Sequence, residues 1–81
     1  MNRRTEILDN LALTMSLMGE DLSGLDLSGE DLSNCAFLNV NFSNCNLRGV
    51  DFTSCQVGNC DFTGADMTGV IAVSSQWIKP I

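Results

Sequence analysis

The side chains of this sequence best suited to binding a metal are four cysteines, Cys35, Cys45, Cys55 and Cys60. Structural zinc sites use pairs of cysteines that are close in sequence, usually completed by histidine. Here neighbouring cysteines are ten, ten and five residues apart, and the chain has no histidine. We therefore predict no metal site and no cofactor. The sequence also lacks a nucleophile elbow and a phosphate-binding loop, so we predict no catalytic residue and no enzyme activity.

Acidic side chains are the second group of chemical interest, because they give the chain a net negative charge. Ten acidic residues stand against four basic ones, a net charge of −6, and Arg48 is the single base between residues 19 and 69. Such a body repels nucleic acid and anionic membranes and attracts a basic protein surface. No segment has the roughly 18 apolar residues of a membrane-spanning helix. Glu6 and Asp9 interrupt the one run that is faintly similar to a signal peptide, so we expect a cytoplasmic protein.

These side chains are positioned by a repeat of five residues, a period that matches neither an α-helix nor a β-strand. Ten apolar residues follow one another at this spacing without a slip in register: Leu22, Leu27, Leu32, Phe37, Phe42, Leu47, Phe52, Val57, Phe62 and Met67. Leu17 continues the series before them, and Ala72 and Trp77 continue it after them. We call these residues the centres. One inward side chain every five residues predicts a solenoid whose stacked coils share a continuous core.

The other positions of the repeat agree with this interpretation. An Asp or Asn usually precedes the centre, and Ser or Thr usually follows it. The second residue after each of the ten centres is Gly, Asn or Ser, the residue types that form turns; Gly and Asn also tolerate a positive φ. All four cysteines occupy the position two before a centre, which predicts that they face inward as small hydrophobic residues.

Units such as Ala65-Asp66-Met67-Thr68-Gly69 and Cys60-Asp61-Phe62-Thr63-Gly64 resemble the A(D/N)LXX unit of pentapeptide-repeat proteins. The resemblance covers residues 20–69 and implies an all-β solenoid, a right-handed quadrilateral β-helix of about 2.5–3 coils with four units per coil. Residues twenty apart would then stack, so that Asn41 separates Asp21 from Asp61, while Asp31 lies directly beside Asp51. Cys35 and Cys55 would stack within disulfide distance, although a reducing cytoplasm keeps them as thiols.

The first coil departs from the family pattern, because Glu20, Leu25 and Glu30 occupy positions that the family fills with small residues. A buried carboxylate without a partner is costly. We therefore expect a distorted first coil, or one open enough for both glutamates to reach water.

Three segments follow from these patterns: an N-terminal capping helix in residues 1–18, the repeat β-helix in residues 19–73 and an end segment in residues 74–81. An apolar stripe predicts that the helix runs over residues 3–18 and ends at Gly19. The C-terminal end is unusually apolar, and uncovered coil ends tend to pair. We therefore predict a homodimer, whose candidate contacts are Val73, Trp77, Ile78 and Ile81.

The leading functional hypothesis is a non-enzymatic protein-interaction module whose acidic faces bind a protein partner with a basic surface. The candidate partner-binding residues are Asp21, Asp26, Asp31, Asp51, Asp61 and Asp66. The resemblance adds an alternative, because the best-known relatives modulate DNA gyrase by imitating B-DNA in shape and charge. A monomer is too short for such mimicry, so this DNA-mimic alternative depends on the homodimer. A structural or oligomerisation element is the remaining alternative, with the acids conferring only solubility.

Overall fold

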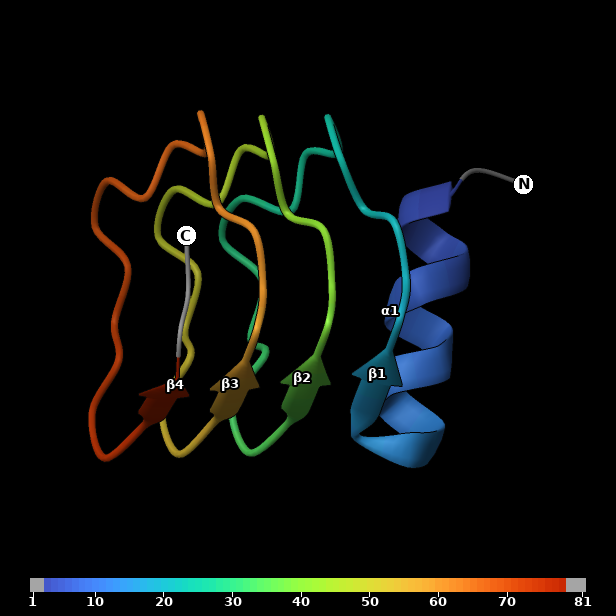
Figure 1. The fold of residues 1–81 in the computed structure, drawn as a ribbon, viewed down its shortest axis with the longest axis vertical. Helices are drawn as coiled ribbons and strands as arrows, with labels where there is room; N and C mark the ends of the chain where they lie inside the picture. Colours follow the sequence, from blue (N-terminus) through green and yellow to red (C-terminus); the bar gives the residue numbers. More distant parts are fainter. Residues whose placement is uncertain (1–2, 79–81) are drawn as a thin grey trace.

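The computed structural model describes residues 3–78 as one helix followed by a chain that coils regularly (Figure 1). Helix α1 spans Arg3–Thr14. The strands are β1 (Ser16–Met18), β2 (Ala36–Leu38), β3 (Gln56–Gly58) and β4 (Gln76–Ile78). They form one parallel sheet in the order β1-β2-β3-β4. Figure 1 shows α1 beside β1, at one end of this row of strands.

The register of the sheet confirms that residues twenty apart stack on one another. Leu17 pairs with Phe37, Phe37 with Val57, and Val57 with Trp77. Three further rows of parallel bridges begin at Asp21, Asp26 and Asp31 and keep the same spacing. The described chain therefore returns to the same side every twenty residues, which is a β-helix-like arrangement. We call each such circuit a coil.

The corners of the coil lie where the turn-forming residues predict them. From residue 19 to residue 74, every fifth residue has a positive φ, including Gly24 at 75° and Asn44 at 59°. In the corner at Gly24, the Leu25 N–H donates to the Leu22 carbonyl at 3.2 Å, which closes a β-turn. A positive φ at the third residue of a β-turn favours Gly or Asn. This backbone requirement explains why the second residue after each centre is mostly Gly or Asn.

The centres form the core, and the core loosens toward the C-terminal end. From Leu17 to Val57 every centre is at most 3% exposed. Phe42 and Phe62 stack with their ring centroids 4.9 Å apart and their planes 3° from parallel, as the spacing of twenty residues requires. In the last coil, Phe62, Met67 and Trp77 pack against the core but are only half-buried.

The prediction of a helix over residues 3–18 is wrong at its C-terminal end, because α1 ends at Thr14. Met15 has a φ of 55°, and its N–H donates to the Leu11 carbonyl at 2.8 Å, so Met15 rather than Gly19 terminates the helix. Leu17 lies in phase with the centres and is 3% exposed, and strand pairing with β2 satisfies the backbone around it. The solenoid thus begins earlier than the apolar stripe suggested.

Of the two expectations for the first coil, distortion is wrong, whereas the access of both glutamates to water is confirmed by side-chain exposures of 36% for Glu20 and 29% for Glu30. The bridges from Asp21, Asp26 and Asp31 have the same parallel register as those of the next coil. Glu20 and Glu30 are partly buried, and each forms an ion pair with an arginine of α1: Arg3 Nη2 lies 2.7 Å from Glu20 Oε2, and Arg4 pairs with Glu30. The helix that covers this coil therefore also neutralises its two glutamates.

Candidate functional site

The six candidate aspartates lie in three rows along the coil, as the predicted stacking requires. The rows are Asp21–Asn41–Asp61, Asp26–Asn46–Asp66 and Asp31–Asp51–Ile71. In the first two rows a neutral amide separates the carboxylates. In the third, Asp31 and Asp51 are direct neighbours, and adjacent strands lie about 4.8 Å apart. The third row therefore contains the closest pair of like charges among the candidates.

Each of these aspartates also holds a corner of the coil, a role that sequence reasoning did not assign to them. The Oδ1 atom accepts a hydrogen bond from the backbone N–H two residues later, at 2.8–3.1 Å in all six cases. Asn41 and Asn46 make the same bond, at 2.9 and 3.2 Å. The repeated Asp/Asn-x-Ser/Thr pattern was the signal for this contact, because Asx-turns favour such residues. The corner needs an oxygen acceptor and does not need a charge.

These bonds stabilise the charged carboxylates. Hydrogen bonds from the hydroxyl and the N–H of the residue two positions later lower the pKa of Asp26, Asp31, Asp61 and Asp66 below its ordinary value. The pKa of Asp21 is lowered chiefly by the Ser23 N–H. These five carboxylates are therefore ionised at neutral pH.

Acidification is expected to destabilise the protein through these aspartates. A carboxyl whose pKa is lower in the folded state stabilises the fold above its unfolded pKa, near 3.9, and loses this contribution as the pH falls through its folded pKa. We expect the urea concentration at the unfolding midpoint to decrease once the pH is lowered below about 4. A variant with Asn at the five positions of lowered pKa, which are Asp21, Asp26, Asp31, Asp61 and Asp66, keeps the acceptors and lacks these titrations. Its midpoint is expected to fall less over the same range, whereas parallel curves for the two proteins would contradict this origin of the acid sensitivity.

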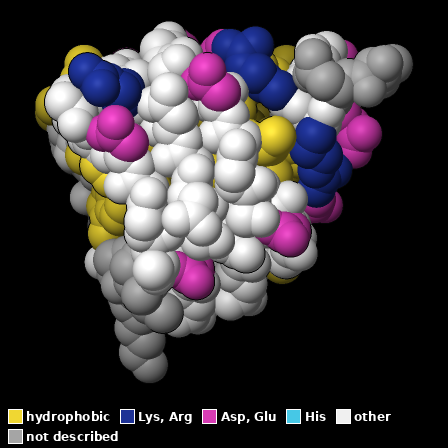
Figure 2. Space-filling model, turned by 90° about the horizontal axis from the view of Figure 1, so that it is seen from above, with side chains coloured by type: hydrophobic (Ala, Val, Ile, Leu, Met, Phe, Trp, Pro, Cys, Tyr) yellow, Lys and Arg dark blue, Asp and Glu magenta, His cyan; other side chains and the backbone are white. Residues whose placement is uncertain are grey.

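The basic side chains neutralise only part of the acidic surface. Arg3 and Arg4 pair with glutamates, and Arg48 Nη1 lies 3.6 Å from Asp66 Oδ2. Among residues 3–78, no other candidate aspartate forms an ion pair. Figure 2 shows acidic side chains set apart from one another by neutral ones, with arginines toward the edges of the face. Most of the charge of the rows thus has no cationic partner within residues 3–78.

The four cysteines face inward, as their position in the repeat predicts. Cys35 is 7% exposed, and the other three are at most 1% exposed. Cys45 Sγ and Cys55 Sγ donate to the carbonyls of Leu22 and Leu32, both at 2.9 Å. Burial raises the pKa of all four thiols, which disfavours the thiolate that metals bind. No group of three or more potential metal-ligating side chains occurs among the described residues.

The candidate dimer contacts are only partly described. Val73 is 61% exposed, and its neighbour Ile71 in the last coil is 49% exposed. Trp77 is half-buried, with its ring centroid 5.1 Å from that of Phe62. The side chain of Ile78 and the whole of Ile81 lie outside the described residues. Val73 is therefore the exposed apolar side chain in this set.

The sequence of residues 26–71 matches the family described as pentapeptide repeats in nine copies. The chain belongs to the pentapeptide-repeat family. Membership in this family suggests a protein-interaction or structural role. The matched region begins after Glu20 and Leu25, two of the residues that depart from the repeat pattern. No curated protein is similar enough in sequence to count as a match. No helix in the described part of this pentapeptide-repeat chain is long and apolar enough to cross a membrane.

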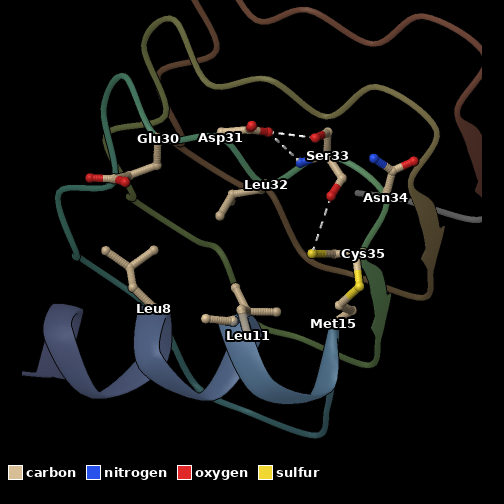
Figure 3. Close-up of a pocket in the computed structure, with 10 residues that line it drawn as sticks. Leu8, Leu11, Met15, Glu30, Asp31, Leu32, Ser33, Asn34 and Cys35 are labelled. Carbon is tan, nitrogen blue, oxygen red and sulfur yellow. Dashed lines mark hydrogen bonds between the residues drawn. The ribbon is translucent and has the colours of Figure 1, made fainter.

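A groove of about 420 Å³ lies between α1 and residues 30–35 (Figure 3). Leu8 and Leu11 of α1 form its apolar wall, and Met15 extends this wall just past the helix. In Figure 3, Leu32 and Cys35 lie opposite the helix, and Asp31 lies at the edge, where it accepts from Ser33. Sequence reasoning could not identify this groove, because it depends on how α1 packs against the first coil.

Proposed function

We propose that this chain is a non-enzymatic, cytoplasmic interaction module whose aspartate rows bind a basic surface of a protein partner. The observation that carries the proposal is the contrast between Asp and Asn at the corners. Asn41 and Asn46 hold their corners as the aspartates do, so the fold does not require the six negative charges. Their presence on regular rows provides a surface for cations. We further propose that the coils follow the right-handed, four-sided course of about 2.5–3 coils that the family resemblance implies.

The test compares the natural chain with a variant carrying Asn at all six candidate positions, both immobilised as baits for proteins of the host lysate. The variant is expected to keep its circular dichroism spectrum, because each corner keeps its acceptor. Partners of the natural chain should be lost from the variant and released at 1 M salt, where the Debye length is about 3 Å. An identical set of salt-resistant partners on both baits would contradict the role of the rows and favour the structural alternative, in which the apolar end makes the contact.

A second candidate function, DNA mimicry toward a topoisomerase, is favoured by the direction of the acidic rows. The rows run along the coil axis and are too short in one chain to imitate a helical turn of duplex, about 34 Å. The exposed Val73 and Ile71 at the last coil suggest an end-to-end homodimer that would lengthen the charged surface.

The mimic and the homodimer are tested together with Val73→Glu, a change at an exposed site that leaves the core intact. Light scattering should give a dimer for the natural chain and a monomer for the variant. Only the dimer should compete with duplex DNA for a type II topoisomerase. A natural chain that is monomeric at about 100 μM would contradict the dimer and with it the mimic.

A further inference from the structure

We propose that the groove between α1 and residues 30–35 is the site that receives an arginine or lysine side chain of the basic partner. This inference rests on the proposed function and names one position within it. The aliphatic stem of the partner side chain would lie on Leu8 and Met15, and its cationic head would reach Asp31. Long basic side chains commonly bury their stem on apolar surface while the charge stays in a polar environment.

The charges around the groove favour this occupant. Glu30 also lines the groove, but Arg4 already pairs with it. Asp31 uses Oδ1 for the Ser33 N–H and hydroxyl, and it forms no ion pair within residues 3–78. Asp51 lies beside Asp31 in the same row, likewise without an ion pair in the described part of the chain. The groove thus has one acidic side chain, Asp31, that no arginine of the described chain neutralises, and Asp51 adds a second negative charge in the next coil.

The apolar wall explains why the occupant would be a side chain with a long stem rather than a bare cation. Leu8 is half-buried and Met15 is 48% exposed, so these two side chains present apolar surface to the groove, whereas Leu11 is buried behind them. The groove volume, about 420 Å³, lies in the range of roughly 300–1,000 Å³ typical of ligand sites. Arg4 shows that a guanidinium binds at this end of the coil, because it donates from α1 to both Glu30 and the Asp26 carbonyl.

Cys35 provides a direct readout of occupancy. Its side chain lines the groove and is 7% exposed, whereas Cys45, Cys55 and Cys60 are at most 1% exposed. Because burial raises the pKa of the Cys35 thiol, alkylation by iodoacetamide is measured at alkaline pH by mass spectrometry, and its rate should report whether the groove is filled. The probe is the blocked peptide acetyl-Gly-Leu-Arg-Leu-Gly-amide, and its control is the same peptide with citrulline, which is nearly isosteric with arginine but uncharged.

The arginine peptide should slow Cys35 alkylation by about two-fold at a concentration equal to its Kd and further above it. The citrulline peptide should protect more weakly. Asp31→Asn, which keeps the corner, should weaken binding by about two- to five-fold, as expected for an exposed ion pair. The matched change Asp61→Asn, in a different row, should weaken it less.

Two results would contradict the proposal that the groove binds a basic side chain, and both are distinct from a failure of the proposed function. Unchanged Cys35 alkylation at millimolar arginine peptide would show that the groove is not filled. Equal losses in Asp31→Asn and Asp61→Asn would show that the rows attract the peptide generally, so the proposed function would stand without the groove. The proposed function itself fails only if the variant with Asn at all six positions retains the partners of the natural chain.

Discussion

Phe52→Ala is expected to lower the free energy of unfolding by about 3–5 kcal/mol, which urea denaturation followed by circular dichroism would measure. Phe52 is 0% exposed and contacts three aromatic rings edge to face. Its centroid lies 5.9 Å from that of Phe37, 6.3 Å from that of Phe42 and 5.5 Å from that of Trp77. A chain of 81 residues has a total stability of roughly 4–12 kcal/mol, so this change removes much of the stability of the fold.

Phe62→Ala is the matched control, because it removes the same side chain from the next coil. Phe62 stacks on Phe42 at 4.9 Å but is only half-buried. Its loss should cost less than the loss of Phe52, in proportion to the smaller apolar area that Phe62 removes from water. Equal costs at the two sites would mean that the last coil is covered in solution, which is the outcome expected if an end-to-end dimer buries Phe62. Measuring both variants at two protein concentrations separates these cases.

The repeat made the core predictable because one inward side chain recurs every five residues. Leu17 shows how far this signal extends: it lies five residues before Leu22, and the structure buries it in β1. The apolar stripe of α1 competed with that signal and placed Leu17 in the helix. The structure resolves the conflict in favour of the period of five, because strand pairing with β2 both buries Leu17 and satisfies its backbone.

The partners of Glu20 and Glu30 could not be predicted from the sequence. The ion pairs link residues 17 and 26 positions apart, from Arg3 to Glu20 and from Arg4 to Glu30. The sequence pattern identifies an amphipathic helix at this end, but it does not specify the direction in which that helix crosses the coil. Once α1 is placed, both glutamates have a cation within reach. Glu20 and Glu30, which depart from the repeat pattern, therefore help to attach α1 to the first coil.

In the aspartate rows, the acceptor oxygen that a corner needs is independent of the negative charge that the side chain carries. A corner needs one acceptor oxygen, and both Asp and Asn supply it. The number and order of charges can therefore change without changing the backbone. Asp31 and Asp51 are adjacent although like charges repel, and Asn at either position would hold the corner without repulsion. The fold alone therefore does not account for the two adjacent charges of Asp31 and Asp51.

Leu11→Ala is the second change for which we expect a large loss of stability, about 2–4 kcal/mol in the free energy of unfolding. Leu11 is 5% exposed and belongs to the core cluster together with Ile7, so it attaches α1 to the first coil. Without that contact the helix should separate from β1 and expose the edge of the sheet. Hydrogen exchange should then accelerate at the amides of residues 16–33 as well as in α1.

Leu13→Ala is the control on the same helix, because the two changes have the same effect on helix propensity. Leu13 is 86% exposed, and its loss should change the free energy of unfolding by no more than about 0.5 kcal/mol. If Leu11→Ala accelerated exchange in α1 alone and left residues 16–33 protected, the first coil would be stable without its cover. The helix would then not be a cap that stabilises the first coil, because the coil would stay folded when the helix is detached. Its remaining roles would be to form one wall of the groove and to pair with the two glutamates.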